Sequence, residues 1–338
     1  MGIFGRAGAR KQDDTVGGDI TVDRCWRNPA LDAGVDAVEE GALNAGVTLL
    51  REARTDPELR ALYVDALSEA AVGRSGQIRA LLTSETDRQE AADILLWLGG
   101  TLISEAWKIR GAGAADTVGA DRFKLFFATL TEAREPLLAA AEINPDDPVP
   151  WNGLQWFAIG MQLDRGEKDY IWQRVVERFP TLYPAHWGRL QMLSAKWGGS
   201  HEEMMEFARG SVESAPPGNP LTSMVALAHA ERQLGRMSEL ASRRRYVAAI
   251  RMNVTYYSDQ VKQELVEAAR RWCAAPVEHP RDLQAHNLFA WSFKEAYEED
   301  HARWHLHQVG DRAHRWPWGS GGDPAGEFAK ARSRFGLA

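Results

Sequence analysis

The sequence predicts an all-α protein, an α-solenoid built from stacked antiparallel helix pairs. Alanine, leucine, glutamate and arginine dominate at helical spacing, and no series of short alternating Val/Ile/Thr runs stands between turns. Helix-start patterns recur along the chain. A motif with two prolines also repeats at a nearly constant step. Together these observations favour a helical-repeat fold.

The chain is expected to divide into a tail, a repeat domain and a short end. Residues 1–22 are predicted to be a flexible N-terminal tail, because the start is rich in Gly, Arg and Asp and lacks the apolar run of a secretory signal. The helical-repeat domain is predicted over 23–318, with a subdivision near the Gly-rich stretch 111–120 left open. Residues 319–338 are expected to form a C-terminal tail or a short helix.

Apolar periodicity predicts four helices in the first part of the chain, near 31–53, 57–72, 87–109 and 121–143. Capping boxes mark helix starts, since a Ser or Thr oxygen caps a free amide while a Glu three residues later reaches back. Two such patterns are Thr55 with Glu58 and Ser200 with Glu203. Pro57 falls in the opening turn, where its missing amide hydrogen costs nothing.

The two-proline motif sets the period of the helix pairs. Its prolines recur at steps of 35 and 36 residues, as Pro145, Pro180 and Pro216 and as Pro148, Pro184 and Pro220. The same step relates Trp151 to Trp187, Leu154 to Leu190 and Gln155 to Gln191. This period is typical of a tetratricopeptide-like helix pair, which buries its apolar face only by stacking on neighbours. Trp151 and Trp187 are therefore predicted to pack between helices.

A later pair, 283–293 followed by 298–309, repeats the helix-turn-helix pattern. Four segments also carry a resemblance: 105–111 (EAWKIRG), 145–148 (PDDP) ahead of Trp151, 196–200 (KWGGS) leading into 206–209 (EFAR), and 309–318 (VGDRAHRWPW). In these the chain resembles an actinobacterial family of tetratricopeptide-like proteins of unknown function, over roughly residues 24–318. The resemblance implies a helical-repeat fold and brings no catalytic residues. The chain lacks the regular small-residue positions of the general tetratricopeptide consensus.

Composition excludes several functional classes. The net charge of −7 argues against general nucleic-acid binding, which needs a surplus of Lys and Arg. Cys25 and Cys273 form no CxxC pair, which favours a reducing, cytoplasmic setting over a disulfide framework. The longest apolar stretch, 94–103, is too short to span a bilayer, so no membrane partner is expected. Phosphate-loop and nucleophile-elbow motifs are absent, and no cofactor is predicted.

The leading functional hypothesis is a non-enzymatic scaffold or adaptor that presents a groove to a protein or peptide partner. Lys196 and Trp197 sit in a glycine-containing turn, where they are predicted to offer a cationic and an aromatic contact at the mouth of the groove. Other predicted groove residues are Trp187, His229 and Glu231; His229 and Glu231 interrupt the apolar helix 221–234.

Two further sets of residues are candidates for partner contact. The tryptophans near the C-terminal end, where a terminal unit must cap the stack or dock against something, are Trp304, Trp316 and Trp318. A local basic patch predicts binding of an acidic partner or a phosphate, and its residues are Arg236, Arg243, Arg244 and Arg251. The alternative for this patch is a solvated helix face.

The rival hypothesis is a metal-binding protein or metal-dependent enzyme. His301 and His305 lie one helical turn apart, Glu298 shares their face, and such a pair can hold zinc if a further ligand is added. The helical metalloprotease spacing is absent, and packed or solvated histidines are the alternative. A third hypothesis is a small-molecule sensor with a cavity lined by tryptophan.

Overall fold

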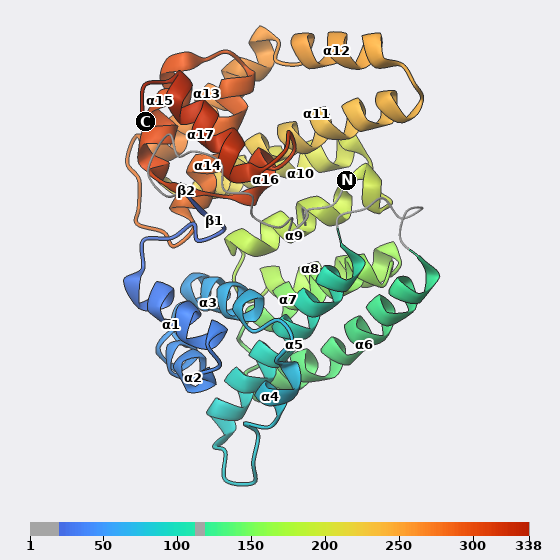
Figure 1. Ribbon diagram of the computed structural model, residues 1–338, viewed down its shortest axis with the longest axis vertical. Helices are drawn as coiled ribbons and strands as arrows, with labels where there is room; N and C mark the ends of the chain where they lie inside the picture. Colours follow the sequence, from blue (N-terminus) through green and yellow to red (C-terminus); the bar gives the residue numbers. More distant parts are fainter. Residues whose placement is uncertain (1–19, 112–118, 338) are drawn as a thin grey trace. The chain divides into compact units, whose positions relative to one another are not determined.

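The computed structural model describes residues 20–111 and 119–337, and it confirms the all-α prediction (Figure 1). Regular structure in these residues is helical apart from two strands of two residues each. Contacts divide the chain into two compact units. The N-terminal unit comprises residues 28–192, and the C-terminal unit comprises residues 20–27 together with 193–337. None of the described helices is long and apolar enough to cross a membrane.

The N-terminal unit contains the helices α1 (Pro29–Glu39), α2 (Leu43–Glu52), α3 (Pro57–Ala70), α4 (Ser75–Arg79), α5 (Arg88–Arg110), α6 (Ala120–Ile143), α7 (Val149–Gly160), α8 (Arg165–Val176) and α9 (Tyr183–Leu193). The long helices α5 and α6 run antiparallel, and α3 and α7 both pack against α5. Trp97 and Phe126, which are almost fully buried, contribute large side chains to this core from α5 and α6.

Two details of the predicted N-terminal helices are wrong. The helix expected at 31–53 is two helices, because the chain turns at Gly41, whose φ of 96° lies in the region that only glycine adopts readily. The capping residue of α3 is Asp56 in place of the predicted Thr55. The Asp56 carboxylate accepts hydrogen bonds from the amides of Glu58 and Leu59 at 3.0 and 3.1 Å.

A buried ionic network joins α3, α5 and the α6–α7 junction. The Arg60 guanidinium, with 3% of its side chain exposed, lies 2.8 Å from Asp93 and 2.8 Å from Asp147. Asp93 is fully buried and also pairs with Arg54 at 2.5 Å. Burial alone would lower the pKa of Arg60, but the two carboxylates outweigh it and raise that pKa. One guanidinium therefore holds three segments of the unit.

The C-terminal unit contains β1 (Thr21–Val22), a 3-10 turn (Ala195–Trp197), α10 (His201–Ser214), a second 3-10 turn (Pro220–Ser223), α11 (Met224–Ser242), α12 (Tyr246–Thr255), α13 (Asp259–Cys273), α14 (Asp282–Glu295), α15 (Glu299–Val309), β2 (Arg312–Ala313), α16 (Arg315–Trp318) and α17 (Pro324–Arg334). Ser200 caps α10 as predicted, accepting from the Glu203 amide at 3.0 Å. The expected short helix within 319–338 is α17.

Segments from both ends of the chain meet in this unit. Strands β1 and β2 pair in parallel, with Thr21 opposite Arg312 and Val22 opposite Ala313. Asn287 on α14 donates to the Arg312 carbonyl at 3.1 Å and accepts from the Trp318 indole at 2.9 Å. These hydrogen bonds attach the β2–α16 segment to α14.

The repeat positions take the packing role that their period predicts. Trp151 is 8% exposed and Trp187 is 5% exposed, and the glutamines at the equivalent position, Gln155 and Gln191, are fully buried. The Gln155 amide donates to the Ala185 carbonyl at 3.2 Å, which links α7 to α9. The stacking of all helix pairs into one solenoid stays a prediction.

Candidate functional site

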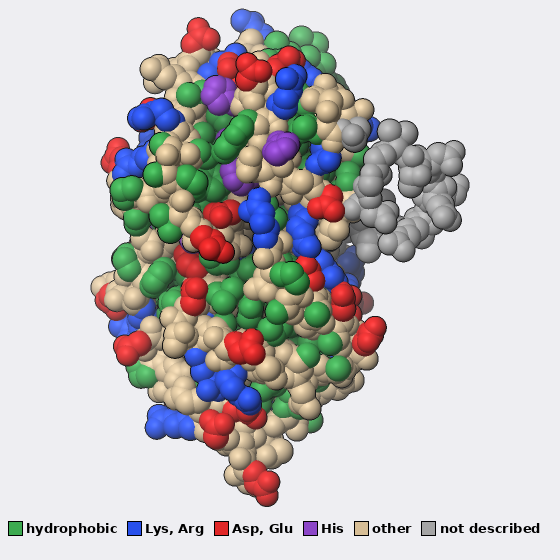
Figure 2. All heavy atoms as spheres, turned by 90° about the vertical axis from the view of Figure 1, so that its left-hand side faces the viewer, with side chains coloured by type: hydrophobic (Ala, Val, Ile, Leu, Met, Phe, Trp, Pro, Cys, Tyr) green, Lys and Arg blue, Asp and Glu red, His purple; other side chains and the backbone are tan. Residues whose placement is uncertain are grey.

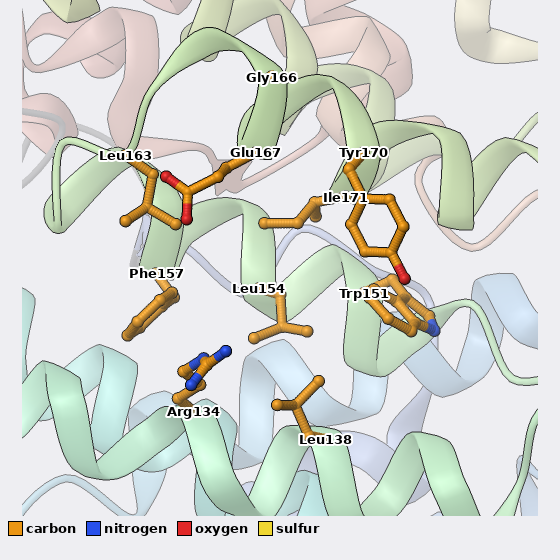
Figure 3. A pocket seen from close by; sticks show the side chains of 10 residues that line it. All are labelled: Arg134, Leu138, Trp151, Leu154, Phe157, Leu163, Gly166, Glu167, Tyr170 and Ile171. Carbon is orange, nitrogen blue, oxygen red and sulfur yellow. The ribbon is translucent and has the colours of Figure 1, made fainter.

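A pocket of about 730 Å³ opens between α6, α7 and α8 in the N-terminal unit (Figure 3). Its volume falls in the range of ligand-binding clefts in general. Its lining is Arg134, Leu138, Trp151, Leu154, Phe157, Leu163, Gly166, Glu167, Tyr170 and Ile171. We call it the α6–α8 groove.

Local sequence places three apolar side chains on the floor of this groove. Pro148 precedes α7, and the Asp147 carboxylate accepts from the Val149 amide at 2.9 Å, so the helix begins at a defined residue. Trp151, Leu154 and Phe157 follow at intervals of three residues and lie along one side of α7. The floor is therefore apolar along its length.

The two walls come from α6 and α8. Arg134 and Leu138 rise from α6, while Tyr170 and Ile171 extend from α8 toward them (Figure 3). Helix α8 begins with a reciprocal capping box between Asp164 and Glu167, which fixes the end of the groove. The Glu167 carboxylate is engaged in that cap.

One end of the groove is aromatic and basic. The Trp151 and Tyr170 rings meet edge to face with centroids 6.0 Å apart. The guanidinium of Arg174 lies 5.3 Å and that of Arg178 5.4 Å from the Trp151 ring centroid. Burial and the neighbouring Arg174 lower the pKa of Arg178. The Glu177 carboxylate pairs with Arg174 at 2.9 Å and lies 4.0 Å from Arg178, so two guanidinium groups and one carboxylate meet beside Trp151.

The chemistry of this lining suits binding. Six of the ten residues have large aliphatic or aromatic side chains with no titratable group, and Tyr170 adds an exposed phenol. The lining contains no histidine, cysteine or serine, and its one carboxylate, Glu167, is held by the cap. Apolar side chains with a few fixed polar groups are characteristic of sites that recognise shape and charge.

The residues predicted to line a groove lie elsewhere and are largely internal. Lys196 donates to the buried carboxylate of Glu231 at 2.9 Å, and its ammonium lies 5.9 Å from the Trp316 ring centroid. Trp187 and His229 are buried in their own units, with 5% and 1% of their surface exposed. These positions remain predictions for partner contact, although packing accounts for the burial of Trp187, His229 and Glu231.

The three C-terminal tryptophans differ in exposure. Trp304 on α15 is 45% exposed and its ring meets His305 edge to face. Trp316 and Trp318 are 8% and 1% exposed, and Trp318 packs edge to face on Phe328 of α17. Trp304 is therefore the one of the three with a large free surface.

His301 and His305 of α15 pack against aromatic side chains. His305 is buried with its Nδ1 2.8 Å from Nδ1 of His286, and His301 stacks on Phe293 at 4.9 Å. Burial lowers the pKa of His286 to about 3 and holds the pKa of His305 well below 6.5, so both imidazoles are neutral and one donates to the other.

Glu298, the third residue of the predicted metal set, pairs instead with Lys262 at 3.0 Å. Across residues 20–111 and 119–337, no three His, Cys, Asp or Glu side chains are grouped as metal ligands. Figure 2 shows one face of the molecule where histidine side chains reach the surface among apolar and charged neighbours. The geometry around His305 is that of a packed aromatic cluster.

The predicted basic patch is partly exposed and extends over α11, the turn that follows it and α12. Arg243 pairs with Glu239 one turn earlier at 2.8 Å, while Arg244 and Arg251 lie at the start and on the outside of α12. Arg236 is half-buried on α11. The four therefore do not converge on a single point, but three of them surround α12.

His229 forms a polar relay with residues from three other segments. Its Nδ1 lies 3.0 Å from the Tyr256 hydroxyl and its Nε2 lies 3.1 Å from the Glu264 carboxylate. The Arg209 guanidinium donates two hydrogen bonds to the same carboxylate, at 2.6 and 3.2 Å. Burial alone would raise the pKa of Glu264, but the hydrogen bonds from His229 and Arg209 lower it to about 2. Burial raises the pKa of Tyr256, which stays a neutral hydroxyl. The relay fixes the helices that carry it.

Sequence reasoning singled out Trp151 for packing and missed the groove beside it. Arg134, Tyr170 and Ile171 carry no motif, and each belongs to an ordinary helical pattern. The Asp164–Glu167 capping box marks the start of α8, but such a pattern does not predict which helix α8 faces.

Comparison with known proteins gives no family for this chain. No model of a protein family matches it, and no curated protein matches it either. The resemblance to actinobacterial tetratricopeptide-like proteins therefore stays a prediction.

Proposed function

We propose that the protein is a non-enzymatic helical-repeat adaptor whose α6–α8 groove binds a short apolar, acidic segment of a protein partner. The observation that supports this most is the lining of the groove, which combines an apolar floor with the exposed Arg134, while Arg174 and Arg178 lie next to the lining residue Trp151. Helical-repeat proteins commonly bind partners in grooves of this kind between neighbouring helices.

The floor of the α6–α8 groove indicates that the partner segment carries apolar side chains. Trp151, Leu154 and Phe157 are each less than a tenth exposed, yet all three border the groove, so an inserted side chain would rest on an apolar floor. Burial of apolar surface against such a floor supplies most of the affinity in interfaces of this type.

The arginines beside the α6–α8 groove indicate that the partner segment also carries acidic side chains. Arg134 is exposed and projects across the groove (Figure 3), and Arg174 and Arg178 flank Trp151 at the other edge. The only carboxylate in the lining, Glu167, is occupied by its cap. A partner carboxylate placed beside Arg134 would gain a charge-assisted hydrogen bond.

The proposed setting is the cytoplasm. Cys25 and Cys273 are both free, Cys25 is buried, and burial raises the pKa of each thiol, so both remain protonated and unreactive at neutral pH. Such thiols are compatible with a reducing compartment.

Peptide selection tests the proposal. A display library of random peptides is selected on the full chain, and the affinity of the selected peptides is measured by fluorescence anisotropy. We expect sequences with two or three apolar residues next to Asp or Glu. We also expect Arg134→Glu to weaken their binding about tenfold or more, because a charge-assisted hydrogen bond becomes a repulsion.

The matched control is Lys124→Glu, the same charge reversal on an exposed residue of the same helix that does not line the groove. It should leave the affinity unchanged. Tyr170→Ala, at a side chain 56% exposed, should also weaken binding while preserving the fold. Selected peptides that bind the Arg134 and Tyr170 variants as tightly as the wild type would refute the proposed site.

A further inference from the structure

Helix α12 presents its large apolar side chains to solvent. Tyr246 is 61% exposed, Val247 82%, Ile250 65% and Val254 67%. Val247, Ile250 and Val254 are spaced at i, i+3 and i+7, so they form one stripe along the helix. Soluble proteins rarely expose a contiguous apolar patch without using it for binding. We call these four residues the α12 stripe.

The inward face of α12 is small and polar. Ala249 is the one buried residue of the helix. Asn253 accepts from the Gln233 amide of α11 at 2.7 Å, and Tyr256, which follows the helix, hydrogen-bonds to His229 of α11 at 3.0 Å. The usual amphipathic order is therefore reversed, with polar groups inside and β-branched side chains outside.

The inward hydrogen bonds fix this orientation. Gln233 and His229 are each 1% exposed, and turning α12 to bury its stripe would leave their polar groups without partners. His229 is itself anchored by Glu264, and Glu264 by Arg209. Within the part of the chain that the structure describes, α12 packs over several residues against α11 alone. The outward position of the stripe is thus built into the fold.

Charge around the stripe identifies the chemistry of what covers it. Four exposed arginines flank the stripe, and they are Arg243, Arg244, Arg245 and Arg251. Helix α12, with the sequence YVAAIRMNVT, contains no acidic residue, and Glu239, on α11, pairs with Arg243 at 2.8 Å. Three of the arginines precede α12 at its N-terminal end and Arg251 lies within it. An apolar surface with arginines beside it complements an apolar surface with carboxylates beside it.

We propose that the α12 stripe is a docking face for an acidic amphipathic helix of a partner protein, distinct from the α6–α8 groove. The i, i+3, i+7 spacing matches the apolar seam of a helix lying alongside, as in helix-in-groove recognition. A second copy of this chain fits poorly, because two stripes brought together would oppose two sets of arginines.

The test is a selection on the full chain from a displayed library of helices about 20 residues long. In each helix Leu or Ile recurs at alternating steps of three and four residues and forms an apolar face. Half of the remaining positions are Asp or Glu, and the others are random. We expect acidic helices to be enriched and to bind the wild type. We expect Val247→Asp and Ile250→Asp each to weaken that binding about tenfold or more. Both side chains are exposed, so the variants should keep the wild-type melting temperature.

Val277→Asp is the matched control, since Val277 is 60% exposed in the same unit but outside the stripe. It should bind the selected helices as the wild type does. Arg134→Glu, in the α6–α8 groove, should bind them equally well, which separates this proposal from the adaptor groove.

Three outcomes would overturn the inference. One is that no acidic helix is enriched, or that enriched helices bind Ile250→Asp undiminished. Another is concentration-dependent dimerisation in sedimentation that Ile250→Asp abolishes, which would assign the stripe to a second copy. The last is that no helix binds, while the protein cosediments with phosphatidylglycerol vesicles and Ile250→Asp abolishes the cosedimentation. That result would make the α12 stripe a lipid-binding surface.

Discussion

Replacing Arg60 by methionine is expected to destabilise the N-terminal unit by about 3–5 kcal/mol, because it removes the buried cation that Asp93 and Asp147 share and leaves Asp93 with Arg54 alone as its ion-pair partner among the described residues. Arg60 is 3% exposed and lies 2.8 Å from both Asp93 and Asp147. Methionine fills a similar volume, so lost packing contributes little. Urea unfolding followed by far-UV circular dichroism measures the change.

Arg51→Met is the matched control for this measurement. Arg51 pairs with Glu90, but its side chain is 52% exposed, and exposed pairs contribute less than about 1 kcal/mol. An equal loss of stability in the two variants would mean that the Arg60 network does not hold α3, α5 and the α6–α7 junction together.

Acidification below pH 6.5 is expected to destabilise the protein steeply. Burial lowers the pKa of His286 to about 3 and of His186 to about 4, and it lowers those of His305 and His314 as well. The unfolded chain, with ordinary values near 6.5, binds more protons than the folded chain in this window. Stability is therefore fully present above pH 6.5 and is lost as the pH falls toward the folded-state values.

The size of this loss of stability follows from the lowered pKa values of the buried histidines. His286 and His186 each remove about 1.4 kcal/mol of unfolding free energy per pH unit below 6.5, or about 2 kcal/mol by pH 5, and His305 and His314 act in the same direction. Three of the four lie in the C-terminal unit, so that unit should lose more stability than the N-terminal unit. Urea titrations at pH 7.5 and pH 5.0 measure the loss.

A histidine variant separates this cause from general acid denaturation. His286→Gln should flatten the pH dependence, since it removes one buried imidazole and the charge repulsion that His305 would feel on protonation. His307→Gln, at an exposed position of α15, is the control. A pH dependence that is the same in both variants would contradict the assignment.

The sequence predicted the helical class because the apolar period and the proline step are local properties. Pro148 and Pro184 do stand at the starts of α7 and α9, and Trp151 and Trp187 do pack at equivalent positions. The break at Gly41 was missed, since the apolar pattern runs through it and only the backbone angle reveals the turn.

The candidate site was less predictable, because it depends on which helices pack together. Arg134 and Tyr170 lie on separate helices and line the same groove only because α6 and α8 both pack beside α7. The outward stripe of α12 was also hidden, because a helix with Val247 and Ile250 is ordinarily expected to bury them. The apolar side chains of α12 face outward because its polar side chains form hydrogen bonds to Gln233 and His229, two buried residues of α11.

The proposed adaptor groove is tested most directly by hydrogen exchange of the full chain with and without a peptide selected on it. We expect the bound peptide to slow exchange in α6, α7 and α8, within residues 134–171, and Arg134→Glu to abolish the effect. Slowed exchange confined to other helices, or none at a saturating peptide concentration, would contradict the groove as the binding site.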